Sequence, residues 1–167
     1  IFVADTSVHE YPTSEKMSEI AISTARVVRL FGFDPKVAFV SHSTFGQPIT
    51  SRTKHIRKAV DILKEKNVDF EFDGDMQPDV ALNKEYKNLY PFSDIVGNAN
   101  ILIMPGQHSA AISYKMMKEL GDTKVIGPLL IGLGLPIEIA PLRTSTSELI
   151  NLASIAAYSA DVIDYEK

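Results

Sequence analysis

The chain has 167 residues, of which 45% are hydrophobic and 23% charged, and its formal net charge is −4; these values are ordinary for a soluble globular domain with a real core. The acidic balance and the absence of a basic run argue against nucleic acid as the main partner. There is no cysteine, which excludes disulfides, thiolate metal sites and cysteine nucleophiles and fits a cytoplasmic protein, and no apolar run approaches the roughly 18 to 20 residues of a membrane span.

The first residues predict the end of a buried strand and the loop that follows it. Ile1 to Ala4 is an apolar run, and the polar residues 5–7 come next. The chain lacks an initiator methionine and a signal-peptide pattern, so we expect a piece of a longer protein that begins in the middle of a domain. A helix is predicted from the hydroxyl cap at residues 13–14, with Glu15 in its first turn, to Gly32, which ends it.

Strands and helices alternate along the rest of the chain. Short runs rich in β-branched and aromatic residues predict strands at residues 36–40, 68–72, 99–104, 125–131 and 136–139. Apolar residues at helical spacing predict helices at residues 52–66, 109–120 and 145–162, with a short helix near residues 80–83. This order predicts a three-layer α/β/α sandwich with a largely parallel sheet, and no linker divides residues 1–167 into a second domain.

Polar loops follow several predicted strands, where ligands bind in open α/β sheets. They comprise residues 5–10, 41–47, 105–109 and 135–147. The second begins Ser-His-Ser-Thr-Phe-Gly at Ser41. Its hydroxyl groups, together with backbone N–H groups, can hold a phosphate or pantetheine oxygen. The alternative is a polar turn that satisfies its own backbone.

Histidine and acidic residues carry weaker signals. The spacing of His9, His42, His55 and His108 matches no metal motif. His42 and His108 both follow predicted strands and can meet in a cleft, with an ordinary surface role as the alternative. The acidic residues at 69, 71, 73, 75 and 79 lack the spacing of a calcium loop, and an exposed, alternating strand face explains the first three. The chain has neither a dinucleotide fingerprint nor a nucleophile elbow.

Several segments, in the same order along nearly the whole chain, resemble the middle of phosphate acetyltransferases and phosphate butyryltransferases. They are FVADTSVHEYPTSEKMSEIAISTARVVRLFGFDPKVAFVSHSTFG, DGDMQPDVALN, PFSDIVGNANILIMP and IGPLLIGLGLP with the final helix. The loop SHSTFG, and Met76 and Leu82 in DGDMQPDVALN, are most similar to the C-terminal phosphotransacetylase-like domain of NADP-dependent malic enzymes. The resemblance implies the phosphotransacetylase type of sandwich, which is like that of isocitrate and isopropylmalate dehydrogenases.

The resemblance also implies ligands and partners. It implies coenzyme A (CoA) or acetyl-CoA as the ligand of this domain. NADP and a divalent metal would serve only a malic enzyme domain of the same chain, outside these residues. That domain would oxidatively decarboxylate malate to pyruvate. It further implies a homodimer or higher oligomer formed through this half of the fold. The small-residue helical stretches 109–114 and 153–158 are compatible with close helix packing across such an interface.

The segment APLRTSTSELIN, residues 140–151, departs from the family pattern. In active members the matching segment carries a serine and an arginine that stabilise the reacting groups and an aspartate that assists deprotonation of the CoA thiol. Here Pro141, Leu142 and Glu148 stand at those positions, so the hydroxyl group and the charge are missing. Arg143 lies one position late. We therefore expect no catalytic residue in this segment.

Glu148 has a second interpretation, because Ser145 and Glu148 have the spacing of a helix capping box. The helix would then bury the apolar residues at positions 149, 150, 152, 153 and 155. The first hypothesis is an acetyl-CoA-binding regulatory domain, with ligand contacts from Thr6, Ser41, Ser43, Thr44, Arg143, Ser145 and Glu148. The alternatives are an active phosphate acetyltransferase, which moves acetyl between CoA and phosphate, and a structural module that binds no ligand.

Overall fold

The computed structural model describes residues 1–121 and 123–162, apart from the side chains of Lys87 and Val162. The chain divides into two compact units, residues 1–113 and residues 114–167. Helix α5 (Gln107–Leu120) begins in the first unit and ends in the second. The prediction that residues 1–167 form a single domain stays a prediction, and each unit is described by itself.

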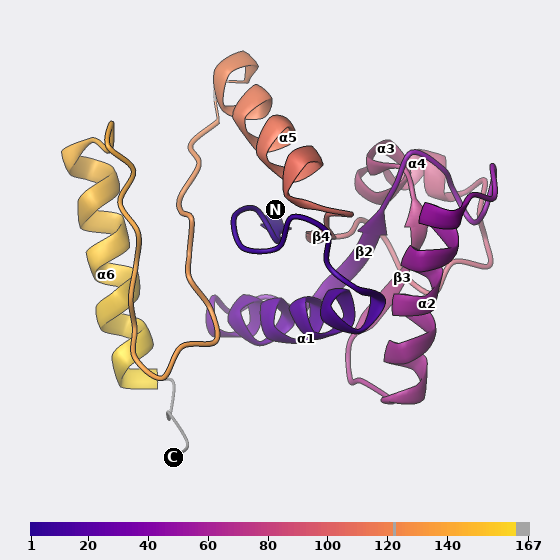
Figure 1. The fold of residues 1–167 in the computed structure, drawn as a ribbon, viewed down its shortest axis with the longest axis horizontal. Coiled ribbons are helices and arrows are strands. Elements are labelled where there is room, and N and C mark those ends of the chain that lie inside the picture. Colours follow the sequence, from indigo (N-terminus) through magenta and orange to yellow (C-terminus); the bar gives the residue numbers. More distant parts are fainter. Residues whose placement is uncertain (122, 163–167) are drawn as a thin grey trace. The chain divides into compact units, whose positions relative to one another are not determined.

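The first unit contains a parallel sheet with helices between its strands (Figure 1). Its elements before α5 are β1 (Phe2–Ala4), α1 (Ser14–Leu30), β2 (Lys36–Val40), α2 (Ser51–Glu65), β3 (Glu71–Met76), α3 (Pro78–Leu82), α4 (Lys84–Lys87) and β4 (Ile101–Ile103). The described residues form a four-stranded sheet in the order β1-β4-β2-β3. Neighbouring strands in this sheet are parallel throughout, which confirms the predicted sheet type.

Helix α1 begins and ends where its local signals predict. The Thr13 side chain accepts a hydrogen bond of 3.2 Å from the backbone N–H of Lys16, and Glu15 lies in the first turn near the positive end of the helix dipole. After Phe31, the backbone passes through Gly32 at a φ of +80°, a conformation that glycine adopts without a steric penalty. These contacts are local in sequence, which is why the pattern alone located the helix.

The sheet is covered on both faces, which confirms the predicted three layers. On one face, Val37, Phe39 and Ile101 pack in a buried cluster with residues of α1 and α2. On the other face, Ala38 and Leu102 pack in a second buried cluster with residues of α3 and the first turn of α5. Successive strand residues point to opposite faces, so the apolar runs in β2 and β4 supply both layers of the core.

Strand β3 differs from its prediction in start and in burial. It begins at Glu71 rather than at residue 68, because its pairing with β2 begins at the Lys36–Glu71 register. The predicted exposed acidic face is wrong at Asp73, which is only 6% exposed; Asp75, which was not assigned to that face, is fully buried. Asp73 is satisfied by backbone N–H groups, since it accepts hydrogen bonds of 2.8 Å from Gly74 and from Asp94.

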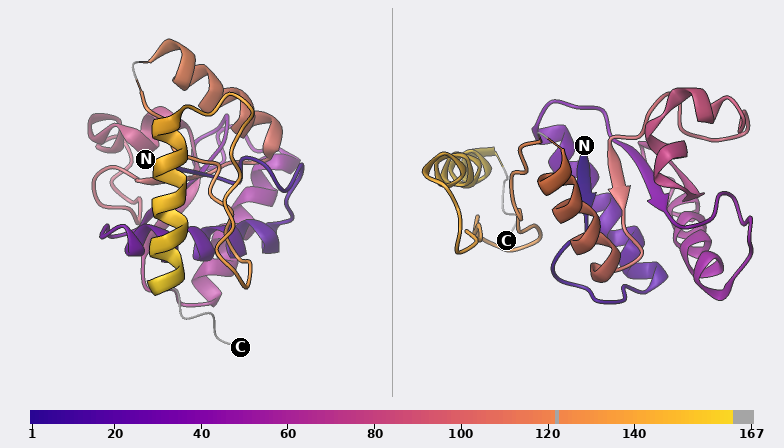
Figure 2. Two further views of the ribbon diagram at one scale, coloured as in Figure 1. Left: turned by 90° about the vertical axis from the view of Figure 1, so that its left-hand side faces the viewer. Right: turned by 90° about the horizontal axis from the view of Figure 1, so that it is seen from above.

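The second unit contains an irregular segment and helix α6 (Thr146–Val162). Within the part of residues 114–162 that is described, the predicted strands at residues 125–131 and 136–139 do not form. The segment makes one isolated antiparallel bridge, between Leu129 and Glu138, and Figure 2 shows it as irregular chain. A strand needs a neighbour for its backbone groups, and the described sheet lies in the first unit.

Helix α6 begins with the predicted capping box. The Glu148 carboxylate accepts a hydrogen bond of 2.7 Å from the Ser145 backbone N–H, and the Glu148 N–H donates to Ser145 Oγ over 3.3 Å. The predicted buried face is confirmed only at Leu152, the one buried side chain among those described in α6; Leu149 and Ile150 are 46% and 61% exposed. Apolar spacing predicts a face that can be buried, but a neighbouring element must cover it.

At Gly74, the backbone of β3 lies very close to β2. A Cβ at this position would lie 2.7 Å from Phe39 Cβ and 2.8 Å from the Phe39 carbonyl oxygen. We expect Gly74→Ala to lower the free energy of unfolding by about 1–3 kcal/mol, because the strands would have to separate. Urea denaturation of the full-length protein measures it. Gly134→Ala is the control, since a Cβ there meets nothing within 4 Å, and equal stability of the two variants would contradict the prediction.

The capping box at Glu148 predicts a dependence of α6 on pH. Hydrogen bonds from the backbone and side chain of Ser145, and then from Lys118, lower the Glu148 pKa from 4.5 to about 2. A carboxyl group whose pKa is lower in the folded state stabilises that state above its ordinary pKa and loses this contribution as pH falls.

We expect hydrogen-exchange protection at the start of α6 to hold from neutral pH to about 4.5 and to decline as pH approaches 2. Mass spectrometry of the exchanged full-length protein measures this protection. Glu148→Gln is the matched control, because its amide oxygen still accepts the cap hydrogen bond but does not titrate. An equal decline in this variant would rule out Glu148 as the titrating group.

Candidate ligand-binding site

The loops that follow the strands meet at one edge of the sheet, because all neighbouring strands are parallel. The strand order places the loop after β4 between those after β1 and β2. Ligands in open α/β sheets bind at this carboxyl edge. The side chains and backbone groups of these loops are therefore the candidate site of the first unit.

Asp5 organises the loop after β1. Its carboxylate accepts hydrogen bonds of 2.8–2.9 Å from the backbone N–H groups of Ser7, Val8 and His9, and it lies 2.7 Å from His9 Nδ1. Burial opposes ionisation of Asp5, but the hydrogen bonds from Ser7, Val8 and His9 outweigh it and hold the pKa below its usual value. Thr6, a predicted ligand residue, lies half-buried in this fixed loop.

The loops after β1 and β4 contact one another closely. The backbone N–H of Gln107 donates to the Glu10 carbonyl over 3.2 Å, and Gln107 Nε2 donates to the Ser7 carbonyl over 3.3 Å. A Cβ at Gly106 would lie 2.5 Å from the Glu10 carbonyl oxygen. Only glycine permits this approach, so the two loops form one fixed rim.

Asp75 organises the loop after β2. It accepts a hydrogen bond from Ser43 Oγ through one carboxylate oxygen and a bond of 3.1 Å from the Gly46 backbone N–H through the other. Its backbone carbonyl accepts the Phe45 N–H over 2.6 Å. Thr44 Oγ1 accepts the backbone N–H of Gln77 over 3.2 Å. Loop and strand end are thus joined by both backbone and side chains.

The predicted ligand residues of this loop separate into two groups. Ser43 and Thr44 are buried, at 0% and 6% exposure, and their hydroxyl groups serve the loop's own structure. Ser41 is half-buried and His42 is exposed at the edge of the sheet. Asp75 was missed as an organising residue; a glycine inside a strand pattern, Gly74, is the signal that marks a close backbone approach there.

His55 and His108 have different surroundings. His55 bridges two helices, with Nε2 at 2.9 Å from the Pro12 carbonyl before α1 and Nδ1 at 3.1 Å from Ser14 Oγ. His108 is exposed in the first turns of α5. Within the described ranges, no hydrogen bond joins His108 to His42, and no group of three or more histidine or acidic side chains is suited to a metal ion. None of the described helices is long and apolar enough to cross a membrane.

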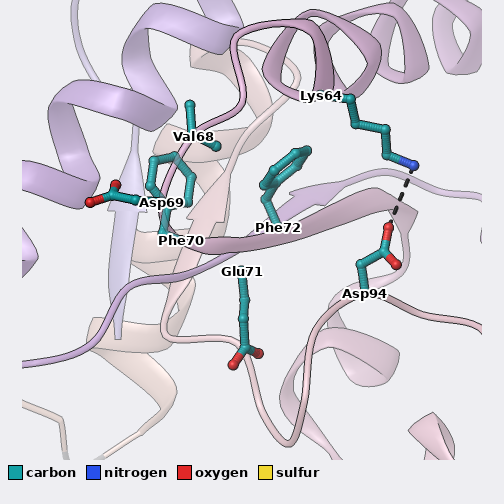
Figure 3. A pocket seen from close by; sticks show the side chains of 7 residues that line it. All are labelled: Lys64, Val68, Asp69, Phe70, Glu71, Phe72 and Asp94. Atoms are coloured by element: carbon teal, nitrogen blue, oxygen red, sulfur yellow. Dashed lines mark ion pairs between the residues drawn. The ribbon is translucent and has the colours of Figure 1, made fainter.

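Two hollows lie along β3 and not over the loops after β1 and β4. The larger, about 680 Å³, is open and has the rings of Phe70 and Phe72 on its wall (Figure 3). The ion pair between Lys64 and Asp94, 3.4 Å long, lies at one side of it. The smaller, about 290 Å³, reaches the loop after β2 through Phe45. Their mixed charges single out no ligand class.

The segment 141–148 lies in the second unit and is described by itself. Leu142 is fully exposed and Arg143 is exposed. Ser145 and Glu148 are brought together by the capping box, and Lys118 Nζ lies 3.3 Å from Glu148 Oε1. A general base works best with a pKa near the working pH, and Glu148, at about 2, is a poor one.

Comparison with known proteins identifies relatives along almost the whole chain. The sequence profile of the family described as "Phosphate acetyl/butaryl transferase" matches residues 1–157. The NADP-dependent malic enzyme of Rhizobium meliloti is 49% identical over 160 residues, which cover 96% of this chain and 21% of the relative. The phosphate acetyltransferase of Clostridium acetobutylicum is 34% identical over 162 residues, which cover 96% of this chain and 49% of the relative.

Solved structures agree with the sequence relatives. A phosphotransacetylase from Streptococcus pyogenes superposes with a TM-score of 0.89 at 34% identity, covering 95% of this chain and 49% of that chain. The chain thus spans about half the length of the Clostridium acetobutylicum and Streptococcus pyogenes proteins and about a fifth of the Rhizobium meliloti malic enzyme. It belongs to the phosphate acetyl/butaryl transferase family and is similar to the C-terminal part of NADP-dependent malic enzymes.

Proposed function

We propose that this chain is an acetyl-CoA-binding regulatory domain of a cytoplasmic NADP-dependent malic enzyme and that it is itself non-catalytic. One observation carries the non-catalytic part. Where the family places its reacting groups, Pro141 and Leu142 offer neither a hydroxyl group nor a charge, and Glu148 is held in a helix cap with a pKa of about 2. Thiol deprotonation needs a base near the working pH, which this segment lacks.

The groups at the carboxyl edge fit the polar oxygens of CoA or acetyl-CoA. Thr6 and Ser41 offer hydroxyl groups on loops that are fixed from within by Asp5 and Asp75. Ser43 and Thr44 contribute by shaping the loop. Preorganised donors of this kind bind phosphate and amide oxygens without ordering a loop first.

In the second unit, Arg143 is the group suited to a ligand phosphate. Its guanidinium is exposed, carries a permanent charge and offers two parallel donors to a phosphate. Ser145 and Glu148 form the helix cap two residues further along the chain, and we assign them to the ligand-binding set through their support of this turn.

The parent activity in this proposal is oxidative decarboxylation of malate to pyruvate, in a malic enzyme domain of the same chain. NADP and a divalent metal belong to that domain, and the described residues contain no cluster of three or more metal-binding side chains. The similarity to malic enzymes, at 49% identity for the Rhizobium meliloti protein, supports this parent. Regulation requires that acetyl-CoA bind two states of the protein with different affinity.

Acetyl-CoA should therefore change the rate of malate-dependent NADP reduction by the full-length protein. Coupling of this kind corresponds to about a 5- to 150-fold change in affinity. The rate is measured at subsaturating malate against acetyl-CoA concentration, and Arg143→Ala should raise the concentration needed for half of the effect. An unchanged rate at acetyl-CoA concentrations that saturate calorimetric binding would remove the regulatory role, and absence of any binding would favour the structural module.

The second candidate function is a working phosphate acetyltransferase. The exposed Arg143 and the 34% identity to the Clostridium acetobutylicum enzyme favour it. Arsenolysis of acetyl phosphate in the presence of CoA distinguishes the two, because only a transferase turns over. Turnover that Arg143→Ala abolishes would establish this second function in place of the first.

We also propose that the protein is a homodimer or a higher oligomer formed through this half of the fold. The exposed apolar side chains of α6, Leu149 and Ile150, support an interface there. A stable interface buries on the order of 1,200 Å² or more.

Sedimentation of the full-length protein at micromolar concentration should give an oligomer, and Ile150→Asp should shift it toward monomer by burying a charge at the interface. Ile49→Asp is the matched control, since Ile49 is 67% exposed and lies on a loop of the first unit. A wild-type monomer, or equal behaviour of the two variants, would argue against this interface.

A further inference from the structure

The carboxyl group of Asp75, near the end of β3, is fully buried. No lysine, arginine or histidine pairs with it within the described ranges. Burial of a carboxyl group without an opposite charge is unfavourable unless hydrogen bonds replace its hydration. Both hydrogen-bonding partners of this side chain, the Ser43 hydroxyl and the Gly46 N–H, belong to the loop after β2. Asp75 therefore serves the conformation of that loop.

The loop's backbone N–H groups can be accounted for one by one. Phe45 and Gly46 donate to Asp75, and Ser41 donates to the Met76 carbonyl over 2.9 Å. Ser43 donates to Ser41 Oγ over a long 3.4 Å, and the remaining donors, at residues 44 and 47, bond each other's carbonyl groups. Among loop residues 41–47, the N–H of His42 alone has no partner in the described structure.

We propose that Asp75 is a positioning residue that holds this loop so that the His42 backbone N–H and the Ser41 hydroxyl bind an anionic oxygen of the acyl-CoA ligand. The inference rests on the proposed function for its ligand. The Asp75 carboxylate accepts from the Ser43 hydroxyl group and the Gly46 N–H, and the Asp75 backbone carbonyl accepts from the Phe45 N–H, so among the described residues the N–H at residue 42 stays available. Because Ser41 Oγ only accepts within the loop, its proton is available to a ligand.

The chemistry of Asp75 predicts which substitutions the loop tolerates. Asp75→Asn keeps one oxygen for the Gly46 N–H, and its amide group can donate to Ser43 Oγ, which reverses that hydrogen bond without breaking it. Asp75→Ala removes both acceptors and leaves the two donors of the loop buried without partners. Asp75→Asn should therefore keep the acetyl-CoA binding that Asp75→Ala loses. If Asp75 instead acted through its negative charge, both variants would lose binding.

Calorimetric titration of the full-length protein with acetyl-CoA tests the proposal. Asp75→Ala should raise the dissociation constant at least tenfold, and Asp75→Asn should stay within threefold of wild type. Asp73→Ala is the matched control, because Asp73 is also buried in β3 but accepts N–H groups of Gly74 and Asp94 outside the loop. Asp73→Ala should bind acetyl-CoA with a dissociation constant within threefold of wild type, even if it loses as much thermal stability as Asp75→Ala does.

A double-mutant cycle separates positioning from general loss of structure. Ser41→Ala should weaken binding in the wild-type background and add less than twofold in Asp75→Ala, because its hydroxyl group is no longer held in place. If Asp75→Ala does not fold, Ser43→Ala is the substitute variant. It removes the hydrogen bond from the fully buried Ser43 hydroxyl group to the Asp75 carboxylate and should weaken acetyl-CoA binding three- to tenfold.

The results distinguish the proposal from the function on which it rests. Wild-type protein that binds no acetyl-CoA would defeat the proposed function, and this inference with it. Wild-type binding that Asp75→Ala and Ser43→Ala leave unchanged would defeat the positioning role alone, as would additive effects in the cycle. Inorganic phosphate is a second probe, since the same donors suit a free phosphate. Weaker phosphate binding with unchanged acetyl-CoA binding would overturn the assignment to the acyl-CoA ligand.

Discussion

Parallel pairing of β2 with β4 and of β2 with β3 is the constraint on which the rest of the first unit depends. A parallel strand that is buried on both faces must be apolar on both faces, as the fully buried Val37, Ala38 and Phe39 are. The same pairing sends every strand toward one edge, so the polar loops collect there. Asp75 stands where core and edge meet, and this explains how a carboxyl group comes to be buried beside an apolar strand.

The sequence predicted those elements whose causes are local. Strand β2 was located at Lys36–Val40 from its composition, and α1 from the cap at Thr13 and the stop at Gly32. The strands expected at residues 125–139 fail for a physical reason. Pairing requires a partner strand, and composition shows only that a segment would suit one. The exposure of Leu149 and Ile150 in α6 has the same cause.

The candidate site was predictable in place but not in detail. The loops at residues 5–10, 41–47 and 105–109 follow from strand order and polarity, and Thr6 and Ser41 lie there. The fourth predicted loop, residues 135–147, follows no strand of the described sheet. A hydroxyl group in a polar loop looks the same in sequence whether it faces a ligand or its own backbone. Ser43 and Thr44 serve the loop's own structure because they bond Asp75, near the end of β3, and Gln77, directly after it. These contacts are distant in sequence, and periodicity does not record them. Glu148 was recognisable as a cap because its partner is three residues away.

The strand order also determines when this unit can assemble during synthesis. Strand β1 pairs with β4, through the register of Phe2 with Ile101, and makes no pairing with β2 or β3. Strands β2 and β3 can pair as soon as both have emerged from the ribosome, but β1 must wait until β4 follows them. Such long-range pairing is slow and leaves apolar edges exposed to aggregation. Among the four strands of the described sheet, β1 therefore gains its partner only when β4, the last of them in the sequence, has been made.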